Sequence, residues 1–230
     1  MLCPMSIDVH ELLVFPGPDG QAGNPLGVIL DGARVPDADR QRVAAQLGYS
    51  ETVFVDDATT GAIRIFTPST ELPFAGHPTV GTAWLLAREG KPVEALRPPA
   101  GTVPVRYEAE LTWITGRPEW APDFDFQQLG SATEVESHPQ PADGRTYVWA
   151  WIDEAAGVLR SRCFPVSLGI AEDEATGAAA VALVGKLGRR VQIHQGVGSV
   201  LVAGPTGDGA VELGGRVSAV RTFALDGAAR

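Results

Sequence analysis

The segment "ATGAAAVALVGKLG" (175–188) constrains the fold of this 230-residue chain more than any other stretch. It has the length of a helix, and apolar or small residues occupy nearly every side of that helix. A helix without a polar face must be buried. A second run, "PTVGTAWLLARE" (78–89), starts with a proline, which is tolerated at the first helical position, and ends before Gly90. The fold must therefore enclose two helices.

Most of the remaining sequence predicts short strands separated by Gly, Pro and Asp, which is typical of antiparallel sheets joined by tight turns. The predicted strands cover residues 7–15, 26–30, 52–55, 63–66, 102–107, 111–114, 146–152, 157–164, 191–195, 199–203, 210–213 and 216–225. One more helix, over residues 37–50, carries Val43, Ala44 and Leu47 on one face and is expected on the surface. We therefore predict an α+β fold in which sheets wrap around two central helices.

The chain contains two similar units. Residues 64–90 and 162–188 both run from Arg-x-Phe through a proline and a polar loop to Thr and small residues that open a buried helix. The polar, Pro-rich segment 117–144 lies between them, so we predict an N-terminal half at 1–118, which the last C-terminal strand could join, and a C-terminal half at 119–230. A duplicated unit predicts a pseudo-two-fold molecule whose two loops face each other across a cleft.

Composition argues against several classes of partner. A net charge of −10 with scattered Lys and Arg argues against nucleic acid, whose phosphates need clustered basic residues. No apolar run approaches the ~20 residues that span a membrane, and the first residues show no secretory signal. The two cysteines, Cys3 and Cys163, form neither a disulfide framework nor a four-ligand zinc site. The histidines show no metal-binding spacing, and a cytoplasmic location is expected.

The starts of the two buried helices are the predicted functional site. Each helix N-terminus presents unpaired N–H groups and partial positive charge, so two converging on one cleft would bind a carboxylate. The titratable residues at these starts are His77 in the first half and Glu172, Asp173 and Glu174 in the second. One acid/base group on each side of a bound acid suits a proton-moving isomerase or epimerase.

Four segments resemble the PhzF-like phenazine-biosynthesis isomerases and occur in the order of that family. They are "GNPLGVIL" (23–30), "YSETVFV" (49–55), "ELPFAGHPTVGTA" (71–83) and "GIAEDEATGAA" (169–179). The resemblance implies a diaminopimelate-epimerase-like fold, with two pseudo-symmetric β-barrel-like halves, each around a central buried helix. It also implies an active site between the halves, a homodimer and no cofactor. In the family reaction, a glutamate moves a proton between carbons of a dihydro-hydroxyanthranilate, assisted by histidine and aspartate.

Matching motifs carry the family roles to particular residues. The resemblance implies Glu51, His77 and Asp173 as catalytic residues, and backbone N–H groups of Gly76 and Gly177 as donors to the substrate carboxylate. The complete set of expected substrate-binding residues is Asn24, Gly76, Thr79, Thr176, Gly177, Ala178, Gln195 and Gly196. The related epimerases place two cysteines at the helix starts. Neither cysteine of this chain lies in such a loop, which argues against a two-cysteine racemase.

The chain departs from the family pattern in four places. Glu174 replaces a proline, Ala178 replaces a serine that usually lies in the site, and "VGSVLVA" (197–203) lacks the usual Arg-Pro-Ser. The chain is also shorter than typical members, with the deficit between Pro118 and Thr146. These differences predict a shortened second half with a reshaped cleft, so the identity of the substrate does not transfer.

The leading hypothesis is a cofactor-independent isomerase that moves a proton on a small carboxylic acid, in secondary metabolite biosynthesis. Two alternatives stay open: an epimerase of an amino acid derivative, and a non-catalytic small-molecule binder that kept the cleft. Structural roles are open for the same residues. Glu51 could be a surface residue, and His77 and Asp173 could be helix caps. Glu172 and Glu174 are expected to be solvated, although Glu174 could add a carboxylate that relatives lack.

Overall fold

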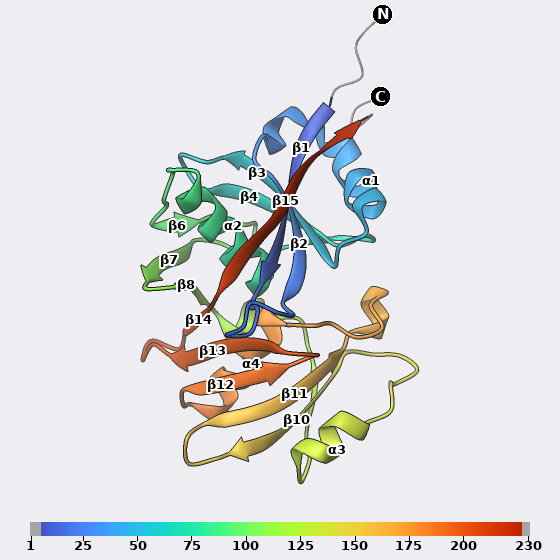
Figure 1. The fold of residues 1–230 in the computed structure, drawn as a ribbon, viewed down its shortest axis with the longest axis vertical. Coiled ribbons are helices and arrows are strands. Elements are labelled where there is room, and N and C mark those ends of the chain that lie inside the picture. Colours follow the sequence, from blue (N-terminus) through green and yellow to red (C-terminus); the bar gives the residue numbers. More distant parts are fainter. Residues whose placement is uncertain (1–5, 227–230) are drawn as a thin grey trace, which may run out of the picture.

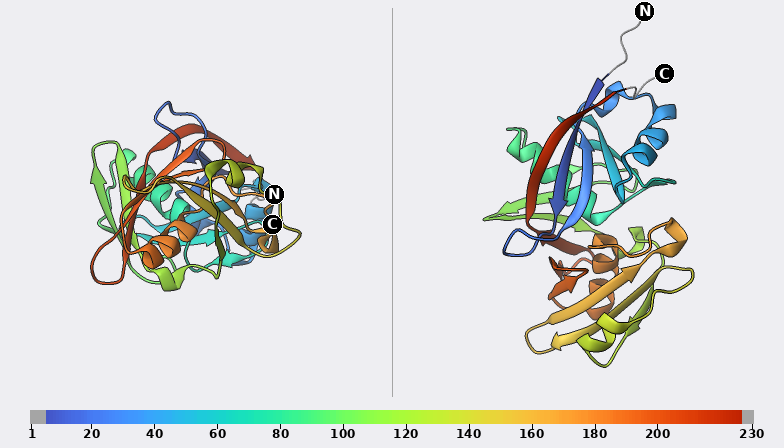
Figure 2. Two further views of the ribbon diagram at one scale, coloured as in Figure 1. Left: turned by 90° about the horizontal axis from the view of Figure 1, so that it is seen from below. Right: turned by 45° about the vertical axis from the view of Figure 1, so that its right-hand side comes forward.

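The computed structural model describes residues 6–226, and Cys3 lies outside this range. The molecule has two lobes (Figures 1 and 2), one containing a six-stranded sheet and the other containing β9 to β13 with α3. The six-stranded sheet has the order β15 (Val217–Asp226), β1 (Ser6–Val14), β2 (Asn24–Ile29), β3 (Glu51–Asp57), β4 (Ala62–Phe66) and β5 (Glu71–Leu72). Its neighbours are antiparallel except for β2 and β3.

The second sheet has nine strands and extends from one lobe into the other (Figure 1). Its order is β6 (Ala95–Leu96), β7 (Val103–Glu108), β8 (Leu111–Gly116), β14 (Val211–Gly215), β13 (Ser199–Pro205), β12 (Val191–Gln195), β11 (Val158–Phe164), β10 (Thr146–Asp153) and β9 (Asp125–Gln128). The helices are α1 (Asp37–Leu47), α2 (Gly76–Arg88), α3 (Ala132–Ser137) and α4 (Gly177–Leu187), with three short 3-10 turns, η1 (Gly32–Arg34), η2 (Pro118–Trp120) and η3 (Val166–Leu168).

The helices α2 and α4 lie in the core, as their apolar sequences predicted. Residues of both belong to one hydrophobic cluster, which also contains side chains from both sheets. The six-stranded sheet is covered on both faces, since Val53 and Val55 of β3 join the cluster around α2, whereas Phe54 packs with the α1 side. Successive residues of a strand point to opposite faces, so a strand buried on both sides has no polar row. This explains the continuous apolar run of β3.

The strand pairing links the two halves of the sequence at two places. The last strand, β15, pairs with β1, so the C-terminal segment completes the N-terminal sheet. Strands β6 to β8 belong to the first half of the sequence, yet β8 pairs with β14 and so extends the nine-stranded sheet. The sheets therefore do not divide at residue 118, and the division into 1–118 and 119–230 stays a prediction.

The segment 117–144 is more than the connection that its polar composition suggested. It contains η2, the strand β9, which pairs parallel with β10, and the short helix α3. The Ser131 hydroxyl accepts a hydrogen bond from the Glu134 backbone N–H, and the Glu134 carboxylate accepts one from the Gly130 N–H. A serine followed three residues later by a glutamate is the sequence signature of a capping box, a helix-start signal. Here the glutamate bonds the N–H one residue before the cap.

The start of α2 differs from the prediction. The helix begins at Gly76 and not at Pro78, and Ala75 precedes it as the N-cap without a side-chain hydrogen bond. Proline is accommodated at the third helical position because the first N–H groups of a helix have no partner within the helix. His77 therefore lies inside the first turn, and the hypothesis that it caps the helix is wrong.

The predicted internal repeat is visible in the structure. In the first half Arg64 pairs with Glu71 through two hydrogen bonds and lies over the ring of Phe66. In the second half Arg162 likewise makes two hydrogen bonds to Glu172 and lies over the ring of Phe164. In each pair the arginine lies on a strand, β4 or β11, and the glutamate lies in the segment between that strand and a central helix. The two units thus share interactions as well as sequence pattern.

The first residues of the two central helices lie in direct contact. A Cβ built on Gly177 would lie 2.8 Å from the Gly76 Cα, and one built on Gly76 would lie 2.7 Å from the Gly177 carbonyl carbon. Both distances are shorter than a van der Waals contact, and the neighbouring atoms are backbone. Only glycine permits this approach.

We expect Gly177→Ala to lower the free energy of unfolding by about 1–3 kcal/mol, because the added methyl group overpacks a backbone contact. Urea unfolding followed by circular dichroism measures the change. Gly130→Ala is the control, since its Cβ would approach only the flexible carboxylate end of Glu134. Equal stability of the two variants would show that the helix starts can separate without cost.

Candidate active site

A cavity of about 180 Å³ lies where α2 and α4 begin. It contains seven of the eleven residues predicted for the site: Glu51, Gly76, His77, Asp173, Thr176, Gly177 and Ala178. Residues from both halves of the sequence therefore meet at one cavity. The other four predicted residues, Asn24, Thr79, Gln195 and Gly196, do not line it.

Glu51 is directed to the cavity by the alternation of β3. It is the first residue of this strand and shares a face with Val53 and Val55, which pack in the α2 cluster. Its side chain is 10% exposed, and Oε2 lies 3.4 Å from Nε2 of His77. Burial, and then the charge of Asp173, raise the pKa of Glu51 to about 8. A carboxyl group with this pKa can both accept and return a proton near neutral pH.

His77 is the uncharged neighbour of Glu51. Its side chain is 3% exposed, and burial lowers its pKa to about 3 against a smaller opposing effect of the Pro25 backbone. The imidazole is therefore neutral at pH 7, and the 3.4 Å contact with Glu51 is not an ion pair. Glu51 Oε2 and His77 Nε2 are buried and have no hydrogen-bond partner among residues 6–226. Buried polar atoms of this kind are normally bonded, so both are available to a substrate.

Asp173, in contrast, is fully bonded. Its Oδ1 accepts a hydrogen bond of 2.7 Å from Asn24 Nδ2, and its Oδ2 accepts one of 2.6 Å from Thr176 Oγ1. Burial raises its pKa to about 6, and these two hydrogen bonds oppose the rise. The N-cap position of α4 belongs to Thr176, so the hypothesis that Asp173 is the cap is wrong.

The predicted residues that do not line the cavity support those that do. Asn24 also donates to the Ala175 carbonyl at 2.9 Å, which ties β2 to the loop before α4. Gln195 Nε2 donates to the Asp173 carbonyl at 3.0 Å and to Thr176 Oγ1 at 2.8 Å. Thr79 Oγ1 donates to the Ala75 carbonyl within α2. Asn24 thus holds the side chain of Asp173 in position, and Gln195 holds its backbone carbonyl.

Glu174 is half-buried and hydrogen-bonded within the protein, whereas a freely solvated side chain was expected. Its carboxylate accepts hydrogen bonds from the Val197 N–H at 2.9 Å, the Gly198 N–H at 3.3 Å and the Ser199 hydroxyl at 2.8 Å. These donors form the turn between β12 and β13. Glu174 therefore fastens the loop that carries Asp173 to a hairpin of the nine-stranded sheet.

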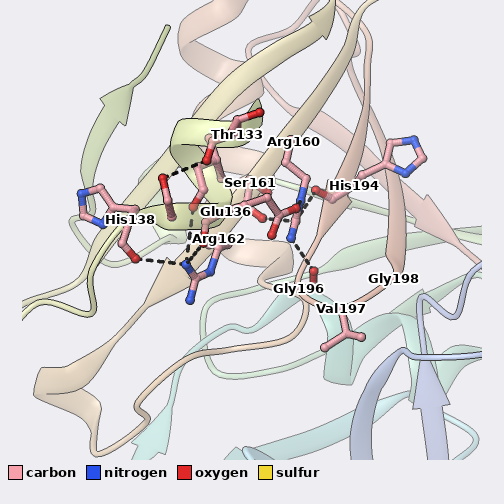
Figure 3. Close-up of polar contacts among 12 residues, drawn as sticks. Thr133, Glu136, His138, Arg160, Ser161, Arg162, His194, Gly196, Val197 and Gly198 are labelled. Carbon is pink, nitrogen blue, oxygen red and sulfur yellow. Dashed lines mark hydrogen bonds and ion pairs between the residues drawn. The ribbon is translucent and has the colours of Figure 1, made fainter. Parts of the chain in front are cut away.

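Two arginines of β11 make hydrogen bonds to backbone carbonyl groups of neighbouring elements (Figure 3). Arg160 bonds the β12–β13 segment, and Arg162 bonds the end of α3. Arg160 donates to the His194 carbonyl at 2.9 Å and to the Gly196 carbonyl at 2.6 Å. Arg162 donates to carbonyl groups at the end of α3 and, on its other side, pairs with Glu172. Both guanidinium groups are used within the protein, so this cluster is a structural support and not an anion site.

Sequence reasoning missed most of the cavity wall. Apolar residues from three separate segments line it: Leu72, Pro73, Phe74, Trp120, Pro122, Phe124, Pro165, Leu168 and Ile170. Arg145 lines it as well. Trp120 and Phe124 lie in a polar, Pro-rich segment. Aromatic residues in such a segment were the one sequence signal that could have indicated a ligand-binding wall.

Residues 6–226 contain neither a metal-binding cluster nor a membrane-spanning helix. No group of three or more His, Cys, Asp or Glu side chains in this range could hold a metal ion. Within the same residues, the helices are too short or too polar to cross a membrane.

Fold and site together define the class of protein: two α+β halves whose central helices meet at a cavity with buried acid/base groups. A family model described as phenazine biosynthesis-like protein (PhzC-PhzF) matches residues 18–134. A trans-2,3-dihydro-3-hydroxyanthranilate isomerase from Pseudomonas fluorescens is 30% identical over 215 residues, covering 76% of this chain and 77% of that protein. The chain belongs to the phenazine biosynthesis-like family.

Other relatives agree with this assignment. An uncharacterized isomerase from Pasteurella multocida is 43% identical over 94 residues, which cover 38% of this chain and only 32% of that protein. The crystal structure of a PhzF-family phenazine biosynthesis protein from Bacillus anthracis superposes with a TM-score of 0.74 at 19% identity, covering 96% of this chain and 99% of that one. The predicted family and the predicted two-half fold are confirmed, and the expected isomerase agrees with the names of the relatives.

The raised pKa of Glu51 makes stability depend on pH. The folded protein holds this proton up to about pH 8 instead of 4.5, so the stabilising contribution is complete below pH 4.5 and is lost as pH rises through about 8. Glu51→Gln removes this titration. We expect the variant to gain stability over the wild type between about pH 5 and about pH 9, as measured by urea unfolding.

The matched control is Glu119→Gln, which changes an exposed glutamate of η2. The lowered pKa of His77 costs stability only as pH falls below 6.5, and it does so equally in both proteins. The assignment of a raised pKa to Glu51 would be refuted if the difference in unfolding free energy between the wild type and Glu51→Gln did not change with pH.

We expect Glu174→Ala to lower the free energy of unfolding by about 1–3 kcal/mol, because the N–H groups of the β12–β13 turn lose a charged acceptor. Denaturant unfolding at neutral pH measures the loss. Glu154→Ala, in the exposed turn between β10 and β11, is the control. If Glu174→Ala and Glu154→Ala lowered the free energy of unfolding equally, water would be replacing the Glu174 carboxylate as acceptor, and the prediction would be wrong.

Proposed function

We propose that this protein is an isomerase that moves a proton between two carbon atoms of a small carboxylic acid, without a cofactor. The observation that carries the proposal is the pair of buried, unbonded atoms Glu51 Oε2 and His77 Nε2, 3.4 Å apart at the cavity. The helix starts at Gly76 and Gly177 offer N–H groups and partial positive charge for the substrate carboxylate.

Glu51 is the proposed proton carrier. Its ionised form is a strong base for a carboxylate, because burial raises the pKa to about 8, and it removes a proton from one carbon of the bound acid. The neutral carboxyl group then returns the proton at a second carbon within its reach. His77, neutral and adjacent, donates or accepts a hydrogen bond at the part of the substrate where electron density shifts.

Asp173 is proposed as an orienting group and not as a second proton carrier. Both of its oxygen atoms already accept hydrogen bonds, from Asn24 and Thr176. An epimerase that takes a proton from one face and adds one to the other needs a free acid/base group on each side. The geometry therefore favours a single-carrier isomerase over the epimerase alternative.

The substrate of the relative from P. fluorescens, trans-2,3-dihydro-3-hydroxyanthranilate, is the first compound to assay. By family resemblance we also propose that the protein is a homodimer of the cytoplasm and serves secondary metabolite biosynthesis. The proposed halves at 1–118 and 119–230 supply Glu51 with His77 and Asp173 with Thr176, respectively.

We expect Glu51→Gln to reduce turnover by ~10²-fold or more, because the amide cannot carry the proton. Turnover in D2O, followed by nuclear magnetic resonance, reports deuterium at the carbon that receives the proton. Glu119→Gln is the matched control and should keep the wild-type rate. Full activity in Glu51→Gln would eliminate the assignment, and ligand binding with neither turnover nor exchange in the wild type would favour the non-catalytic alternative.

A further inference from the structure

Arg145 is the one arginine or lysine among the residues that line the cavity. It directly precedes β10 and lies two residues before Tyr147, which together with Trp149 belongs to the core cluster around α4. Alternate residues of an extended chain share a face, so Arg145 is on the cavity side of β10. The residue is half-buried, and its backbone carbonyl is used in the pairing with β9.

The Arg145 side chain has no partner within residues 6–226. Every other arginine in this range makes an ion pair, a hydrogen bond or a contact with an aromatic ring. A guanidinium group carries five N–H donors and is charged at all relevant pH values. Keeping such a group half-buried and unpaired costs free energy, and an anionic ligand would offset that cost.

The position of Arg145 is separate from the acid/base groups. The charges that shift the pKa values of Glu51 and Asp173 belong to other carboxyl groups, and Arg145 is not among the groups that lower either pKa. Much of the remaining wall is apolar and includes Phe74, Trp120 and Phe124. The cavity therefore offers the helix starts and Arg145 as two places for an anion, within a largely apolar lining.

We propose that Arg145 binds a second carboxylate of the substrate, so that the site selects a dicarboxylic acid with an apolar, ring-sized body. The inference rests on the proposed function for the location of the first carboxylate, at the starts of α2 and α4. A planar guanidinium group matches a carboxylate through two parallel hydrogen bonds, which gives direction as well as affinity. Arg145 would then be a specificity-determining residue.

Calorimetric titration with matched acids tests the proposal without requiring turnover. The probes are cyclohexanecarboxylate with cyclohexane-1,3-dicarboxylate, and benzoate with isophthalate. We expect the wild type to bind at least one diacid ~10-fold or more tightly than its monoacid, the preference typical of a charge-assisted hydrogen bond. Arg145→Met should abolish that preference and leave monoacid affinity within ~3-fold, while Arg145→Lys should keep part of it.

Arg34→Met, on the exposed turn η1, is the control and should retain the full preference. Unfolding midpoints of all variants establish that they are folded, and Arg145→Lys preserves the charge if Arg145→Met does not fold. Equal binding of monoacids and diacids by the wild type would overturn the proposal. So would an equal loss of both in Arg145→Met, because Arg145 would then hold the only carboxylate. Neither result affects the D2O test of Glu51, so the two proposals fail separately.

Discussion

The contact between Gly76 and Gly177 is the constraint on which the rest of the site depends. Two buried helices begin there with their backbones in contact, which is possible only without side chains at both positions. The first N–H groups of each helix have no partner inside the helix, so the contact concentrates unpaired donors and partial positive charge at one point. The cavity, the catalytic candidates and the supporting loop are arranged around this point.

The two buried carboxyl groups beside this point are stabilised in different ways. Asp173 receives hydrogen bonds from Asn24 and Thr176, and Gln195 holds its backbone, so its charge is partly compensated by the protein. Glu51 has an unbonded oxygen atom and the higher pKa, about 8. Burying a charge without a partner costs much more than burying a bonded one. The free-energy cost of burying its charge therefore raises the pKa of Glu51, and a pKa near neutral pH suits a group that accepts and returns a proton.

Much of this arrangement could be predicted from sequence, and the failures have physical causes. The all-apolar pattern of 175–188 identified a buried helix, and the motifs around Glu51, His77 and Asp173 identified residues that meet at one cavity. The start of α2 was placed two residues late because proline is tolerated anywhere in a first turn. The cavity wall could not be predicted, since side chains such as Phe74 and Trp120 come together only through tertiary packing.

The departures from the family motif are connected in the structure. Where the family has proline, which restricts the backbone by its ring, Glu174 restrains the same loop through hydrogen bonds to the β12–β13 turn. Ala178 lines the cavity with a methyl group at the position where the motif that the chain resembles has a serine. Arg145 also lines the cavity, and under our proposal it binds a second carboxylate of the substrate. Neither Glu174 nor Arg145 is one of the groups proposed to move the proton, so the proposed step at Glu51 is compatible with a dicarboxylic substrate.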